Sequence, residues 1–129
     1  MSEPILYVDT SEIREGKLEE LKTAMNELVE FVETNEPGLI AYNVYLNEDG
    51  NQMTVVHVHS DSASLEFHML VAGPLFPKFA AFIKLLRIDV FGSPSDHLVE
   101  QLRQKAQMLG SGTVLVHELH AGFARFAVR

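Results

Sequence analysis

The sequence lacks cysteine and tryptophan altogether among its 129 residues. Without cysteine the chain forms no disulfide and has neither a thiol nucleophile nor thiolate ligands for a metal. Basic residues are also scarce, since 10 Lys and Arg stand against 18 Asp and Glu and the formal net charge is -8. Such an acidic surface repels phosphate groups, so we expect neither a nucleic acid nor a membrane as partner.

Long apolar runs are missing as well. The most apolar region, residues 69–91, is interrupted by prolines and charged residues and is too broken to span a bilayer. The N-terminus carries acids where a signal peptide has a basic head, so we expect a cytoplasmic protein. Hydrophobic residues make up 47% of the chain, which is enough for one core, and we expect residues 1–129 to form a single domain.

Two hydrophobic periods are present, one typical of strands and one typical of helices. Asp49-Gly50 predicts a hairpin turn, and Glu36-Pro37-Gly38 predicts the end of the first helix. The expected strands are 4–9, 39–46, 53–60 and 86–92. The expected helices are 15–34 and a second one that is capped by Ser60 or Asp61, is interrupted at Gly73-Pro74 and Pro77, and resumes over 77–86.

Strand, helix, strand, strand, helix, strand is the order of a ferredoxin-like βαββαβ fold, of the α+β class with an antiparallel sheet. We expect this core to occupy residues 4–92, with 93–129 as a C-terminal extension. The expected elements of the extension are a helix that starts at Ser93-Pro94-Ser95-Asp96 and ends at Gly110, then a long bent strand or a hairpin over 113–128.

The predicted hairpin carries large apolar groups on both faces. Val56 and Val58 share one face of its second strand, while Met53 and Val55 share the other. The two crossover helices of this topology cover one face only, and soluble monomers rarely leave the second exposed. We therefore expect a homodimer with two sheets packed face to face. The extension is an alternative cover for that face, or a brace across the dimer.

Three histidines fall in the stretch TVVHVHSDSASLEFH. His57 and His59 leave the same face of a strand, and with His68 they suit a general base and its orienting group, because neutral imidazole accepts a proton near pH 7. Hydrogen bonding at the dimer seam is an alternative role. A metal site is a further alternative, with the other ligands from His117, Glu118 and His120.

Aromatic side chains are spread over the predicted strands and helices and suit the walls of a pocket for a flat ligand. Phe79 and Phe82 are three apart on a predicted helix, a spacing more often found in a plain core. We interpret Asp9 as a solvated strand end, and a role as a carboxylate partner is the alternative. The candidate wall residues are Tyr7, Tyr42, Tyr45, Phe67, Phe76, Phe79 and Phe82.

The segments EPGLIAYNVYLNEDG, MTVVHVHSDSASLEFHM and GPLFPKF together resemble the antibiotic-biosynthesis-monooxygenase (ABM) superfamily. The resemblance covers about residues 4–92 and depends on a Glu-Pro-Gly turn, a hairpin, and a strand that leads into a helix with a histidine. It implies a dimeric α+β barrel built from two ferredoxin-like sheets. Members include cofactor-free monooxygenases of phenols or quinols, haem-degrading enzymes and proteins with no assigned activity.

Position by position, the resemblance matches His68 to the family's helix histidine. His59 falls where the family usually has a bulky aromatic residue, and His57 falls where it often has glutamate. Tyr42 and Asn43 fall on the strand beside the pocket. Haem-degrading members typically depend on a tryptophan, which this chain lacks, so the resemblance does not imply haem degradation.

These patterns favour a small homodimeric enzyme that oxidises an aromatic phenol or quinol with no bound cofactor and no metal. The alternative is a non-catalytic homodimer that binds a small apolar ligand or acts as a scaffold, and the departures at positions 57 and 59 favour it. The expected catalytic residues are His68 and His59, and the expected substrate-binding residues are Tyr42, Asn43, His57, Phe67 and Phe79.

Overall fold

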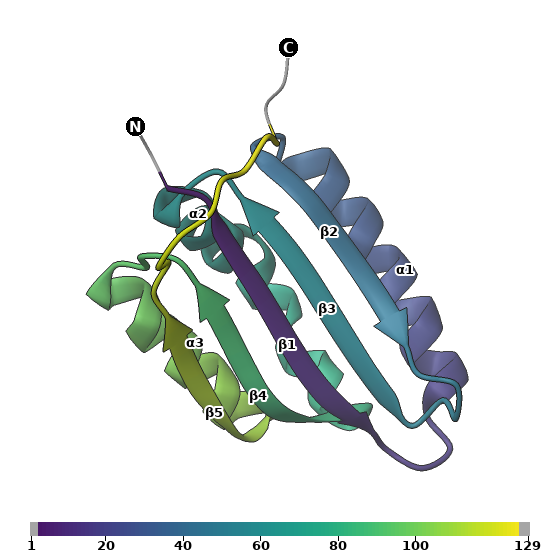
Figure 1. The fold of residues 1–129 in the computed structure, drawn as a ribbon. Helices are drawn as coiled ribbons and strands as arrows, with labels where there is room; N and C mark the ends of the chain where they lie inside the picture. Colours follow the sequence, from purple (N-terminus) through teal and green to yellow (C-terminus); the bar gives the residue numbers. More distant parts are fainter. Residues whose placement is uncertain (1–2, 127–129) are drawn as a thin grey trace.

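The computed structural model describes residues 3–126, which form a five-stranded sheet with helices packed against it (Figure 1). The fold is α+β, and its first six main elements follow the predicted ferredoxin-like order. The strands are β1 (Ile5–Ile13), β2 (Leu39–Leu46), β3 (Gln52–His59), β4 (Ile83–Phe91) and β5 (Gly110–His117). The helices are α1 (Leu18–Asn35), α2 (Ser62–Ala72) and α3 (Asp96–Leu109), with short 3₁₀ helices η1 (Gly73–Leu75) and η2 (Pro77–Ala81) between α2 and β4.

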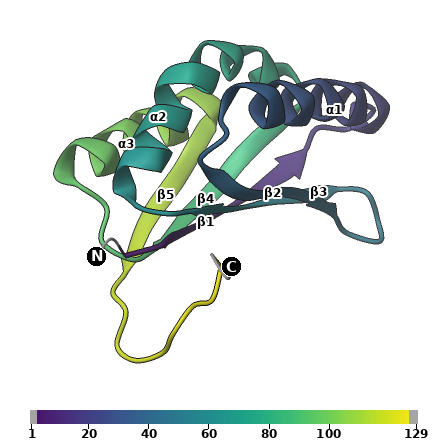
Figure 2. The ribbon, with the colours of Figure 1, turned by 90° about the horizontal axis from the view of Figure 1, so that it is seen from above.

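The sheet has the strand order β2-β3-β1-β4-β5. Neighbouring strands are antiparallel except for β4 and β5, which are parallel and joined through α3. The three α-helices lie on the same side of the sheet, as Figure 2 shows. The extension therefore adds a helix to the covered side and a strand to the β4 edge. None of the helices described has both the length and the apolar content needed to cross a membrane.

The core lies between the sheet and the helices. In β1 every second residue is buried, Ile5 and Tyr7 among them, because strand side chains alternate between the two faces. In α1 the buried residues Leu21, Leu28 and Val32 recur at helical spacing and meet the sheet. This packing makes one side of each element apolar and leaves the charged side of α1 exposed.

One predicted helical segment, 77–86, is wrong. Only a short 3₁₀ helix forms there, and β4 begins at Ile83. Ile83 and Leu85 are buried while Lys84 is exposed, so the alternation of a strand prevails over helical spacing at this point. The strand is consequently longer than predicted and passes the full length of β1.

The extension also differs in detail from its prediction. Ser95 caps α3, with its Oγ accepting the N–H of Leu98 at 3.1 Å, so the proline before it lies outside the helix. The strand predicted over 113–128 ends at His117. Residues 118–126 have no regular structure and leave the sheet on the side opposite the helices (Figure 2); 127–129 lie outside the described residues.

The face of the sheet opposite the helices is apolar over several strands. Leu6 and Val8 on β1 and Val56 on β3 lie on this open face, since their neighbours in sequence face the helices. Phe91 and Leu115 extend it and are 40% and 39% exposed. An apolar second face is thus present, and the homodimer that it suggests stays a prediction.

Candidate functional site

A cluster of polar side chains lies inside the layer between the sheet and the helices. All its members except Tyr42 are buried. Burying polar groups costs free energy unless they are hydrogen-bonded, so such a concentration requires either mutual partners or a ligand. This polar cluster consists of Tyr7 and Asp9 from β1, Glu36 after α1, Tyr42 from β2, His57 and His59 from β3, His68 from α2 and Lys105 from α3.

His68 binds a carboxylate through one ring nitrogen and leaves the other free. Its Nδ1 lies 2.9 Å from Glu36 Oε1 and 3.0 Å from Glu36 Oε2. Because a carboxylate only accepts hydrogen bonds, Nδ1 carries the hydrogen and donates it. Burial lowers the pKa of His68, against the opposing effect of the Glu36 hydrogen bond, so the ring is neutral at pH 7. Its Nε2 therefore holds a lone pair, is buried and has no hydrogen-bond partner among residues 3–126.

Glu36 is placed beside His68 by the end of α1. It is the C-cap residue, and its N–H donates to the carbonyl of Val32. Pro37 follows, and a proline disfavours helical conformation in the residue before it. The chain therefore turns toward β2 at Glu36, whose carboxylate is buried next to α2.

His57 and His59 project from β3 toward the helices. His57 Nδ1 lies 3.2 Å from His59 Nε2, and His59 Nδ1 lies 2.8 Å from Ser64 Oγ. Ser64 lies in the first turn of α2. Asp61 caps this helix, because its Oδ1 accepts the backbone N–H of Ser64 at 2.9 Å. Burial, with a smaller contribution from His68, lowers the pKa of both rings, that of His59 to about 3. The two rings are therefore neutral, and they are hydrogen-bonded to each other and to the start of α2.

Lys105 brings a positive charge into the cluster. Its Nζ donates to Tyr7 Oη at 2.6 Å and lies 3.5 Å from Asp9 Oδ2, to which Tyr7 Oη donates at 2.6 Å. Burial lowers the pKa of Lys105 and Asp9 opposes that shift, while burial and Asp9 both raise the pKa of Tyr7. Asp9 is thus a buried partner, and its interpretation as a solvated strand end is wrong because β1 continues to Ile13.

Aromatic rings connect the two ends of the cluster. The ring centre of His57 lies 4.3 Å from that of Tyr7 and 4.7 Å from that of His68. The Phe76 ring lies 5.8 Å from the His68 ring and 4.4 Å from Lys105 Nζ. The His68 ring and the Lys105 ammonium group therefore both lie next to the Phe76 ring.

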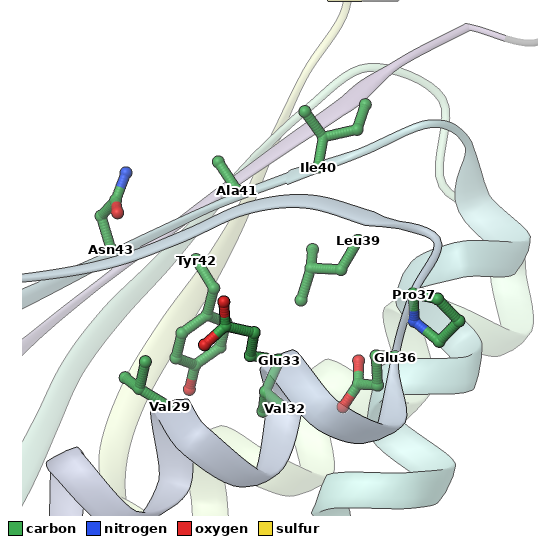
Figure 3. A pocket seen from close by; sticks show the side chains of 10 residues that line it. All are labelled: Val29, Val32, Glu33, Glu36, Pro37, Leu39, Ile40, Ala41, Tyr42 and Asn43. Atoms are coloured by element: carbon green, nitrogen blue, oxygen red, sulfur yellow. The ribbon is translucent and has the colours of Figure 1, made fainter.

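Tyr42 separates two cavities. An open groove of about 420 Å³ lies between α1 and β2, and both Glu36 and Tyr42 line it. Figure 3 shows the Tyr42 side chain pointing toward α1, whereas Asn43 points to the other side of β2. On the inner side, a chamber of about 30 Å³ borders Tyr42, Asp9 and Lys105. The groove is large enough for a small organic molecule, and the inner chamber holds about two water molecules.

Four of the residues predicted for the site meet in the cluster: His57, His59, His68 and Tyr42. The three histidines lie between the sheet and the helices of their own chain rather than on the open sheet face where the dimer is predicted. The site is consequently built within a single chain.

Three other predicted residues lie elsewhere. Phe79 borders the inner chamber, and its ring packs edge-on against Phe82, 6.1 Å away. Asn43 is exposed and borders the groove from the side opposite to Tyr42. Phe67 is 47% exposed on α2 and does not face the cluster. The alternation of strands and the rotation of a helix separate these residues from their sequence neighbours.

The residues considered for a metal do not converge. His117 lies on β5, with β1 and β4 between it and β3, and its Nε2 is 2.9 Å from an Asp89 carboxylate oxygen. His120 and Glu118 belong to the exposed segment after β5. Across the part of the chain that the structure describes, no group of three or more ligating side chains is placed to hold a metal ion.

Sequence reasoning missed the roles of Glu36 and Lys105, and it gave the partner role of Asp9 only as the alternative. Glu36 had been interpreted only as part of a turn. Lys105 does carry a signal, because it occupies the apolar stripe of α3 together with Leu102 and Leu109. A lysine in such a stripe indicates a buried charge, although not its partner.

The structure is thus that of an α+β protein whose candidate site is a buried histidine held by Glu36, a carboxylate that also lines the groove. A family model for antibiotic biosynthesis monooxygenases matches residues 4–85. The chain belongs to the antibiotic biosynthesis monooxygenase family. No curated protein matches the sequence.

Several solved structures share the fold. MupZ from Pseudomonas fluorescens has a TM-score of 0.75 and 25% identity, over 100% of this chain and 94% of that one. SnoaB from Streptomyces nogalater, a cofactor-independent oxygenase, has a TM-score of 0.61 and 14% identity, over 73% of this chain and 96% of that one. A conserved protein from Methanosarcina mazei Go1 has a TM-score of 0.60 and 22% identity, over 67% and 89%. The alignment with MupZ therefore includes the extension.

Proposed function

We propose that the protein is a monooxygenase that oxidises a small aromatic phenol or quinol without a bound cofactor, and that His68 is its general base. The observation that carries the proposal is the buried Nε2 of His68, which has no partner among residues 3–126, on a ring whose other nitrogen Glu36 holds. A buried acceptor without a donor costs free energy, and a ligand hydroxyl would remove that cost. Membership of a monooxygenase family supports the same class of reaction.

In this reaction Nε2 accepts a proton from the ligand, and the carboxylate of Glu36 stabilises the imidazolium that forms. The anion left on the ligand reduces dioxygen more readily than its neutral parent. Overall the substrate loses two hydrogen atoms and gains one oxygen atom, and the second oxygen atom leaves as water. The substrate thus supplies all four electrons that dioxygen takes up, and no further reductant is required.

We place the ring of the substrate in the groove between α1 and β2. Tyr42 lines this groove, and its ring centre lies 5.6 Å from that of His68, so one side chain separates the groove from the base. Displacement of Tyr42 would connect the two. His59 then acts as an orienting group for His57, whose Nδ1 lies 3.2 Å from its Nε2, rather than as a base, since a pKa of about 3 makes it a poor proton acceptor near neutral pH.

Oxygen uptake with a panel of quinols and anthrones tests the proposal. His68→Gln should lower kcat/KM by about 100-fold or more, because the general base is lost. Glu36→Gln should lower it less, since an amide oxygen still accepts the Nδ1 hydrogen but no longer offsets the imidazolium charge. His97→Gln, at an exposed position on α3, is the control. Turnover by His68→Gln equal to that of the wild type would remove His68 from the mechanism.

A non-catalytic ligand-binding homodimer is the second candidate, and the small volume of the inner chamber favours it. In that case the groove binds the ligand while the polar cluster only stabilises the fold. Titration calorimetry with the same quinols would then detect binding, whereas no variant and no wild-type sample would consume oxygen.

A further inference from the structure

The extension supplies a buried cation to the site. The family match ends at residue 85, and α3, which carries Lys105, begins at Asp96. Lys105 is only 7% exposed, and a lysine is almost never buried without a pair. Asp9 is that pair, yet buried ion pairs are often replaceable by apolar residues at little cost in stability. Pairing alone therefore does not account for a lysine at this position.

The ammonium group also borders the inner chamber, where one polar wall atom has no hydrogen-bond partner among residues 3–126. Lys105, Asp9, Ser11 and Tyr42 provide the polar walls of the inner chamber, and the remaining walls are methionine, leucine, phenylalanine and other apolar side chains. Ser11 is 0% exposed, and its Oγ has no hydrogen-bond partner among the described residues. An apolar chamber with a cation and a free hydroxyl suits one polar atom of a bound molecule.

We propose that Lys105 is a further catalytic residue, whose ammonium group binds the ligand oxygen on which negative charge develops, with Ser11 Oγ as a second donor. This inference rests on the proposed function, because it names the group that stabilises the anion formed when His68 removes a proton. The extension outside the matched family region thereby completes the site.

The chemistry requires two groups on one ligand. The proton forms a bond to His68 Nε2, and the electron pair of the broken bond stays on the ligand. In a conjugated ring this charge is shared with other oxygen atoms, so Lys105 need not hold the atom that lost the proton. Lys105 and His68 both lie next to the Phe76 ring, with Lys105 Nζ 4.4 Å and the His68 ring centre 5.8 Å from its centre. An ammonium already fixed in an apolar site stabilises such an anion without reorganising.

The neighbours of Lys105 hold the ammonium in place and keep it charged. From β1, Tyr7 accepts its hydrogen bond and Asp9 supplies the opposite charge, which favours the protonated amine. Tyr42 from β2 also lines this chamber, while His57 from β3 and His68 from α2 lie nearby in the polar cluster, where burial keeps both histidines neutral. When the proton moves, the ligand becomes negatively charged and His68 becomes positively charged, so the total charge of the site does not change.

Binding of 4-nitrophenol measures this role without turnover, because the absorbance of the bound phenol reports its ionisation. In the wild-type protein the ionisation constant of bound 4-nitrophenol should be at least tenfold larger than that of the free phenol. Lys105→Met should abolish this gain, while the affinity for the neutral phenol at low pH changes less than twofold. Lys84→Met, at an exposed position on β4, is the control and should behave as the wild type.

The variants are chosen so that folding does not obscure the result. If Lys105→Met fails to fold because Asp9 is left as an unpaired buried charge, the double variant Lys105→Met/Asp9→Asn removes both charges and should show the same loss. Equal ionisation of the bound phenol in wild type and variant overturns the role of Lys105 and leaves the proposed function standing. A wild-type protein that binds neither 4-nitrophenol nor any quinol of the panel overturns the proposed function, and this inference with it.

Discussion

At the scale of the residue, burial controls the charge of the histidines. His57, His59 and His68 face the interior, and desolvation is the largest cause of the lowered pKa at each. A neutral ring has one nitrogen that donates a hydrogen bond and one that accepts it, so the direction of hydrogen bonding through each histidine is fixed by which nitrogen carries the hydrogen. Glu36 sets that direction for His68 and leaves Nε2 as the acceptor. The same neutral state makes the fold sensitive to acid.

His59 provides a quantitative test of that sensitivity. In the unfolded chain a histidine binds a proton below pH 6.5, whereas folded His59 binds one only near pH 3. Its contribution to stability is therefore complete above pH 6.5 and is lost as the pH falls, by about 2 kcal/mol between pH 7 and pH 5. In His59→Gln the difference between the free energies of unfolding at pH 7 and pH 5, measured in urea, should shrink by that amount.

The exposed His97→Gln variant serves as the control for this experiment and should retain the full pH dependence of the wild type. An unchanged pH dependence in His59→Gln would show that His59 takes up its proton in the folded protein as easily as in the unfolded chain.

At the scale of the element, α3 and β5 are attached to the core through a close backbone approach. Gly110 ends α3 and begins β5, and it lies directly against β4. A Cβ at Gly110 would stand 2.6 Å from the carbonyl oxygen and 2.8 Å from the nitrogen of Leu85. Since both contacts are backbone atoms in a strand, no side-chain rotation relieves them. Glycine is required here because the backbones of β5 and β4 approach each other too closely for a Cβ atom.

Gly110→Ala should therefore destabilise the protein by about 1–3 kcal/mol, the usual cost of overpacking a well-packed site. Urea unfolding followed by circular dichroism measures this loss. Gly38→Ala, where an added Cβ meets no atom within 4 Å, is the matched control and should stay close to the wild type. If the two variants were equally stable, the close contact between Gly110 and β4 would not exist in solution.

At the scale of the whole molecule, the helices cover one side of the sheet and leave an apolar side open (Figure 2). Val8 and Val56 lie near its centre, on adjacent strands that pair in the register Val8↔Val56. Soluble proteins rarely leave such a surface uncovered. A second copy of the sheet is the cover that we predict, with the segment after β5 placed on the same side of the molecule.

Light scattering at micromolar concentration should return twice the chain mass of 14.4 kDa. Val56→Lys should shift the mass to that of one chain, because a charge at the centre of the seam would be buried without a partner. Thr23→Lys, on the exposed side of α1, should remain dimeric. A wild-type mass of one chain would refute the dimer but would leave the polar cluster intact, since a single chain supplies all its members.

The order of the elements, the α+β class and the family were within reach of the sequence. Alternation, helical spacing and the turns at Asp49-Gly50 and Glu36-Pro37-Gly38 are local features, and each depends on residues a few positions apart. His57 and His59 share a face for the same local reason. The segment 77–86 was predicted incorrectly because its short apolar run fits both periods, and packing beside β1 decides between them.

The partners of the buried polar groups were decided by the tertiary structure alone. His68 meets Glu36 across 32 positions of the chain, and Lys105 meets Tyr7 across 98. Such contacts depend on which helix packs over which strand, and no local pattern contains that information. The sequence by itself determined that a charge lies on the apolar stripe of α3. Only the packed sheet and helices determined that this charge and a free hydroxyl border one chamber, within the same polar cluster as a free imidazole nitrogen.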